Sequence, residues 1–280
     1  TTGCRRRVLS MTTVLSGLAA CLFYLASLAS HLFALHEGRA QQRSLRLAML
    51  LALPALLLHL LSWLAEAVTA QGLDFGLFNA ASLLFWVVAA LAWGASWRLP
   101  LANLLLVVYP LTVVAVLCAL FLHSPYSPRH DLGWGIGAHI LLSVLAYSIL
   151  GIAAVQAVAL GLLINRLKHR RLHGVVDVMP PLQTMEYLLF RLIWTGEVLL
   201  ALAILTGALF LENMFAQHLA HKTVLSIVAW LVFAVLLWGK HRLGWRGTTA
   251  VRWTLTGFGL LILAYFGSKF VLELLLQRPA

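Results

Sequence analysis

The chain has 280 residues, of which 62% are hydrophobic and only 10% are charged, and its mean hydropathy is +0.93. Soluble domains carry about 25% charged residues, so this composition excludes an ordinary soluble enzyme and indicates a polytopic membrane protein. The formal net charge of +11 would suggest a nucleic-acid partner in a soluble chain. Here the basic residues stand in short loops between apolar runs, so we expect contact with membrane lipid and no nucleic-acid binding.

The apolar runs predict an all-α fold with eight transmembrane helices. Residues 1–10, TTGCRRRVLS, differ in composition from the apolar run that begins at Met11, and we interpret them as a non-native or upstream leader. Residues 11–280 are expected to form a single transmembrane domain, because each run provides about 20 apolar residues for the bilayer. The expected spans are 11–35, 47–68, 77–97, 101–122, 134–165, 187–211, 223–239 and 251–272.

Basic residues in the loops predict the orientation. Loops on one side of the membrane hold twelve of them: Arg39, Arg43, Arg46, Arg98, Arg166, Lys168, Arg170, Arg171, Lys240, Arg242, Arg246 and Arg252. The other side holds four: Arg129, Lys222, Lys269 and Arg278. The positive-inside rule then places the first set in the cytoplasm and both chain termini on the external, periplasmic side.

The longest loop on the basic side, 167–186, contains two adjacent prolines near its end, Pro180 and Pro181. Proline fits the first turn of a helix and stops a preceding one. We therefore expect a helix to begin close behind them.

Two histidines within the spans are candidate ligands. His139 is five residues inside its span, about 8 Å from the external edge, and His59 is twelve residues inside its own, about 18 Å from the cytoplasmic edge. Two neutral imidazoles that face each other are what a six-coordinate haem iron requires. Alternatively, each imidazole bonds a carbonyl or hydroxyl group and has only a packing role.

Other polar and aromatic groups in the spans leave two interpretations open. A carboxylate within the membrane, such as Glu197, is costly and is either functional or neutral and structural. Four deeply placed tryptophans either line a flat ligand or pack between helices: Trp86, Trp93, Trp194 and Trp230. No hydrolase, NTPase or dinucleotide-binding motif occurs, so we expect no enzyme.

The second half resembles a known family. The segments AHILLSVLAYSIL (138–150), MPPLQTMEYLLFRLIWTGEVLLALAILTGALF (179–210) and HKTVLSIVAWLVFAVLLWGKHRLGWRGTTAVRW (221–253) are similar to the cytochrome c assembly proteins, and in particular to the YpjD-type inner membrane proteins. The resemblance implies a multi-pass protein of the bacterial inner membrane that binds haem and takes part in cytochrome c biogenesis. It implies that His139 and, by a weaker match, His59 are the haem iron ligands, and that haem-delivery or cytochrome assembly proteins are partners.

Two segments depart from the family pattern. The loop before the seventh span is ENMFAQHLAHK, where the family has a tryptophan-rich haem-handling motif, and the last external segment, YFGSKFV, lacks a second histidine. His218 and His221 are weak substitutes as ligands. With no CxxC pair among three cysteines, haem would be held non-covalently. The alternative function is a non-haem accessory or scaffold subunit of another inner-membrane system, such as an ion transporter.

Overall fold

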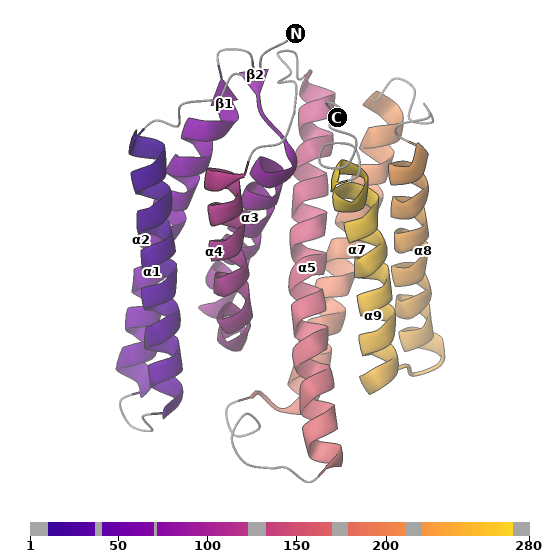
Figure 1. Ribbon diagram of the computed structural model, residues 1–280. Coiled ribbons are helices and arrows are strands. Elements are labelled where there is room, and N and C mark those ends of the chain that lie inside the picture. The colour runs from indigo at the N-terminus through magenta and orange to yellow at the C-terminus, as the bar shows by residue number, and fades with distance from the viewer. Residues whose placement is uncertain are drawn as a thin grey trace.

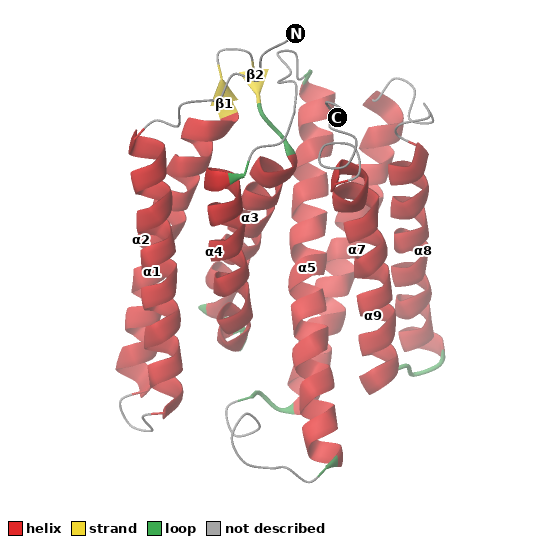
Figure 2. Ribbon diagram, viewed as in Figure 1, coloured by secondary structure: helices red, strands yellow, loops and turns green. Residues whose placement is uncertain are grey.

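The structure is a computed structural model that describes residues 11–36, 41–69, 72–122, 133–169, 179–210 and 220–270. Within these residues, eight helices are long and apolar enough to cross a bilayer, which confirms the predicted all-α membrane fold (Figures 1 and 2). The apolar environment selects helices because a helix satisfies all of its backbone hydrogen bonds internally.

The helices run up and down through the bundle in chain order. Their bounds are α1 Met11–His36, α2 Gln41–Ala67, α3 Leu77–Ser96, α4 Leu105–Phe121, α5 Trp134–Lys168, α7 Leu182–Phe210, α8 Ala220–Arg242 and α9 Gly247–Ile262. A short 3-10 helix, Ala102–Leu104, leads into α4, and a π-helical turn, Leu263–Gly267, extends α9.

Most expected span limits are correct within a few residues, but α2 begins six residues early, at Gln41 instead of residue 47, and the helix after the two prolines begins five residues early. α7 begins at Leu182, directly behind Pro180 and Pro181, instead of at residue 187. The amide of Met185 donates to the Pro181 carbonyl, which shows that proline starts this helix as expected. The expected start is five residues late because polar residues such as Gln183 and Glu186 form the first turns of α7, before the apolar run begins.

One element was not predicted. Strands β1 Val68–Thr69 and β2 Gly72–Leu73 form an antiparallel hairpin between α2 and α3 (Figure 2). Gly72 has a φ of 109°, which a residue with a side chain rarely adopts. We call this end of the bundle the hairpin end.

The opposite end carries most of the positive charge, and we call it the basic end. The described basic residues there are Arg43, Arg46, Arg98, Arg166, Lys168, Lys240, Arg242, Arg246 and Arg252. At the hairpin end, Lys222 and Lys269 are the described counterparts. The helical arrangement therefore gathers at one end the residues on which the orientation was predicted.

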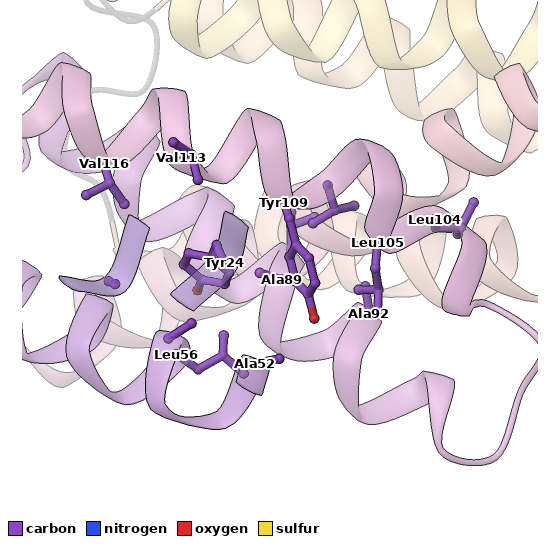
Figure 3. Close-up of a cluster of buried hydrophobic side chains, with 14 of the residues drawn as sticks. Tyr24, Ala52, Leu56, Ala89, Ala92, Leu104, Leu105, Tyr109, Val113 and Val116 are labelled. Carbon is purple, nitrogen blue, oxygen red and sulfur yellow. The ribbon is translucent and has the colours of Figure 1, made fainter. Parts of the chain in front are cut away.

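Two hydrophobic clusters build the interior. The first joins α1 to α4 around Tyr24 and Tyr109, whose rings lie 5.3 Å apart (Figure 3). The second joins α5, α7, α8 and α9 around Phe233 and Leu236. Helix α5 contributes to both, because Ile152 packs in the first cluster while Ala153 packs in the second. It therefore connects the two halves, as does α7 through Leu188 and Leu189.

Two deep tryptophans clamp α3 to α2. The indole N–H of Trp86 donates to the Leu56 carbonyl at 2.9 Å, and that of Trp93 donates to the Met49 carbonyl at 2.8 Å. Trp194 instead is 62% exposed on the outer surface of α7. The packing interpretation is correct for Trp86 and Trp93, because the indole N–H of each forms a hydrogen bond between α3 and α2.

Replacing either clamping tryptophan with phenylalanine removes one hydrogen bond while keeping an aromatic ring. We expect Trp86→Phe and Trp93→Phe each to destabilise the protein by about 1 kcal/mol, and Trp194→Phe to have little effect. Thermal unfolding of the purified proteins in one detergent measures the difference. Equal melting temperatures for the three variants would contradict the clamp.

Candidate functional site

His139 lies near the start of α5, at the hairpin end, and its ring is oriented by α7. Its Nδ1 is 2.8 Å from the backbone carbonyl oxygen of Ala203. A carbonyl only accepts, so Nδ1 carries the proton and, in the neutral imidazole, Nε2 keeps its lone pair. A hydrogen bond of this kind commonly fixes the tautomer of a metal-binding histidine. His139 therefore has the orientation and the available nitrogen that an iron ligand needs.

The helix around His139 is loosely enclosed. No residue from 136 to 145 is buried, whereas the deeper turns of α5 are largely buried. Just before His139, Gly135 packs directly against the Phe210 ring, and that ring also meets Trp134 edge to face, with centroids 4.8 Å apart. The close approach at Gly135 brings α5 against α7, while the turns beyond it stay accessible.

Aromatic rings and one lysine lie on the α9 side of this end. The Tyr147 hydroxyl, two turns below His139, donates to the Leu261 carbonyl at 3.1 Å, and its ring is 6.1 Å from that of Tyr265. Lys269 lies over the Tyr265 ring, with Nζ 5.4 Å from its centroid, and donates to the carbonyl of Phe75. This contact joins the end of the chain's last described helix to the α2–α3 connection.

The burial of Lys269 was not predicted from the sequence. The residue was counted as a loop charge, yet its side chain is only 4% exposed. The available signal was its place within the apolar segment YFGSKFV, four residues after Tyr265, which is the spacing that brings two side chains together on a helix.

His59 lies in a different setting, within the first hydrophobic cluster. Its side chain is 1% exposed. Nδ1 is 3.3 Å from the Tyr24 hydroxyl and Nε2 is 2.9 Å from the Ser82 hydroxyl, so the ring connects α1, α2 and α3. Both ring nitrogens already have partners, as the packing interpretation expected.

His59 and His139 have hydrogen-bond partners on different helices. The nitrogens of His59 point to α1 and α3, and Nδ1 of His139 points to α7. Haem ligation by His59 stays a prediction, and it requires one of its two hydrogen bonds to be released. His218 lies outside the described residues, and the side chain of His221 is not described either.

Among the described residues, no group of three or more histidine, cysteine, aspartate or glutamate side chains could hold a metal ion. A protein-only metal centre therefore has no support in this part of the chain. A haem iron needs fewer protein ligands, because its ring supplies four nitrogens, and the donor set of His139 fits that requirement.

Glu197 is the buried carboxyl group of α7. It is 8% exposed, and neither of its oxygens has a hydrogen-bond partner among the described residues. The contact between Lys240 and the Phe190 ring, 4.6 Å, sets the level of α8 against α7. From that contact Glu197 is about 10 Å along α7 and Trp230 about 15 Å along α8, and the buried indole N–H of Trp230 also lacks a described partner. The Glu197 carboxyl group and the Trp230 indole N–H, both without a described partner, therefore lie at similar heights along the bundle.

Glu186, on the same helix, has the opposite environment. Its Oε1 accepts a hydrogen bond of 2.6 Å from the backbone amide of Gly247. That amide is the first of α9, where backbone N–H groups lack helical partners. Glu186 therefore caps α9 and fixes its start against α7.

Comparison with known proteins gives a consistent result. The family model described as cytochrome C assembly protein matches residues 44–276. The inner membrane protein YpjD of Escherichia coli K12 is 34% identical over 232 residues, which cover 82% of this chain and 88% of that protein. A 28.8 kDa protein of Azospirillum brasilense is 36% identical over 200 residues, or 70% of this chain and 72% of that protein.

A shorter similarity extends to a third protein. The cytochrome c biogenesis protein CcsA of a Synechococcus species is 30% identical over 84 residues, which is 29% of this chain and 24% of that protein. No solved structure matches the chain.

The two glutamates of α7 allow a matched pair of substitutions. We expect Glu197→Met to stabilise the protein by about 1 kcal/mol, because it removes a buried polar group without a partner. We expect Glu186→Met to destabilise it by about 2 kcal/mol, because a charged acceptor is lost from the α9 amide. Thermal unfolding of both variants checks the opposite signs, and two losses of equal size would show that Glu197 has a partner after all.

Proposed function

The chain belongs to the cytochrome c assembly protein family, and on this premise we propose that it binds haem at the hairpin end through the imidazole of His139. It is a multi-pass inner-membrane protein whose role is related to cytochrome c biogenesis. The observation that carries the proposal is the hydrogen bond from His139 Nδ1 to the Ala203 carbonyl, 2.8 Å, which leaves Nε2 for the iron.

The surroundings of His139 suit a large flat ligand. The turns of α5 from 136 to 145 keep part of their surface accessible. Trp134 and Tyr147, on the same helix above and below, supply aromatic surface. Bound haem would contribute an iron that accepts the Nε2 lone pair, and the attachment would be non-covalent, because the sequence has no CxxC pair.

These residues hold and orient a ligand, and the sequence has no hydrolase, NTPase or dinucleotide-binding motif. The proposed activity is therefore haem binding or delivery and not catalysis. The partners that fit this activity are proteins that supply haem or that assemble cytochromes.

The second candidate function is that of a non-haem accessory or scaffold subunit of another inner-membrane system, such as an ion transporter. The observation that favours it is His59, whose two nitrogens are both engaged in the helix interior. With His59 in a structural role, one of the two candidate imidazoles is left for iron.

Haem titration of the purified protein distinguishes the two functions. We expect an absorption band of bound haem that shifts on reduction and that His139→Ala weakens at least tenfold at equal haem concentration, with partial recovery when imidazole is added. His169→Ala is the matched control, because His169 also has Nδ1 2.8 Å from a backbone carbonyl, that of Asn165, but lies at the basic end.

A protein that takes up no haem, or equal binding by the two histidine variants, would contradict the proposal. His59→Ala adds a separate result. If His59 is the second ligand, the haem band weakens or changes in shape, whereas a purely structural His59 lowers the melting temperature alone.

We further propose that the basic end faces the cytoplasm and that both chain termini lie on the external side. The support is the concentration of arginine and lysine at that end. This orientation places His139 in the external half of the membrane, about 8 Å below the start of α5.

Thiol labelling of intact spheroplasts tests the orientation. In a background without native cysteines, we expect Gly133→Cys, at the hairpin end, to react with a membrane-impermeant maleimide. Leu243→Cys, exposed in the α8–α9 turn, should react only after the membrane is opened. The reverse pattern would invert the orientation and move His139 to the cytoplasmic side.

A further inference from the structure

An apolar groove with a volume of about 910 Å³ lies between α4 and α5, and we call it the α4–α5 groove. Its walls come from Leu104 of the short 3-10 helix, Leu111 of α4, Gly151 and Leu162 of α5, Phe258 of α9, and Met179 before α7. Val107, Val158 and Leu162 line it and are also between 47% and 54% exposed on the outside of the bundle. The groove is thus open toward the surrounding membrane.

The groove is hollow because α5 carries small side chains where it lines the groove. Gly151 and Ala154 face it. A methyl group placed on Gly151 would already lie 3.4 Å from the Phe258 ring, so the backbone itself forms part of the wall. The α5 stretch from Gly151 to Leu162 has no charged residue, and its polar side chain, Gln156, is buried and donates to the Met185 carbonyl.

The length and depth of the groove match one leaflet of the bilayer. From Gly151 to Leu162 it follows α5 for eleven residues, or about 16 Å. The hydrocarbon core is about 30 Å thick, so the groove covers about half of it. Leu162 is one turn from Arg166, which assigns the groove to the leaflet at the basic end.

Three arginines are close in sequence to residues that line the groove. Arg166 follows the lining residue Leu162 by four positions, Arg252 precedes Leu255 by three, and Arg98 precedes Pro100 by two. All three side chains are exposed, and within the described ranges none of them forms an ion pair. Positive charge therefore stands where a lipid headgroup of that leaflet would lie.

We propose that the α4–α5 groove binds an anionic phospholipid of the leaflet at the basic end. An acyl chain occupies the groove between Gly151 and Leu162, and the phosphate is held among Arg98, Arg166 and Arg252. A second transmembrane helix fits less well, because the groove ends half-way through the membrane and a spanning helix would leave half of its length without a seat. This inference does not depend on haem binding.

Native mass spectrometry of the full-length protein, stripped of lipid in detergent, tests the headgroup. The probes are phosphatidylglycerol and phosphatidylcholine with identical acyl chains. We expect the anionic lipid to bind at least tenfold more tightly. Arg166→Gln and Arg252→Gln should each weaken it about fivefold, the effect of one basic residue near the surface.

The control for charge is Arg242→Gln, which removes a basic residue from the same end of the bundle, on α8 and away from the groove. It should leave binding unchanged. Equal affinity for the two lipids, or equal losses in all three arginine variants, would overturn the proposal. The arginines would then serve only to orient the protein in the membrane.

Filling the groove tests the acyl chain. Val158→Trp places a large ring in it, and Val235→Trp places the same ring on the exposed surface of α8, where the side chain is 39% exposed. We expect only the first to abolish tight binding of phosphatidylglycerol while both proteins keep their melting temperatures. Unchanged binding by Val158→Trp, or a photo-crosslink from position 158 to a second polypeptide instead of lipid, would overturn the assignment.

Discussion

Polar groups carried into an apolar bundle must find their partners on neighbouring helices, and this constraint determines how the helices of this protein fit together. The Trp86 and Trp93 indoles reach carbonyls of α2, His139 reaches a carbonyl of α7, and Glu186 reaches the first amide of α9. Each bond fixes the level of one helix against another, which nonspecific packing of leucine and alanine would leave free to slide. The proposed site depends on this registration, because the direction of the His139 ring follows from the level of α5 against α7.

The two halves of the bundle use histidine in opposite ways. In the first half, the His59 ring is enclosed by Tyr24 and Ser82, and it serves to hold three helices together. In the second half, one nitrogen of His139 is anchored and the helix around it keeps part of its surface accessible. Helix α5 connects these settings, since its deeper turns pack into both clusters while its first turns carry the accessible histidine. The buried turns of α5 hold the helix in place, and its accessible first turns present the His139 side chain to a bound molecule.

The sequence was informative where a long apolar run or a proline dominates and less so where contacts between helices decide. Eight spans and the concentration of arginines at one end follow from hydropathy and charge, and the helix start behind Pro181 follows from the two prolines. The β1–β2 hairpin escaped prediction, because two-residue strands leave no periodic pattern. The burial of Lys269 and the isolation of Glu197 escaped it too, because both depend on which residues of other helices lie opposite. His139 could be singled out from its position and from the family resemblance, but the carbonyl that orients it could not.

The central claim is that His139 holds the haem iron through Nε2 while Nδ1 stays bonded to the Ala203 carbonyl. A cryo-electron microscopy map of the haem-loaded protein tests both parts at once. The account predicts a haem at the hairpin end, with its iron against Nε2 of His139 and the Nδ1 contact retained. A haem elsewhere in the protein, or an imidazole turned away from Ala203 to reach the iron, would contradict it.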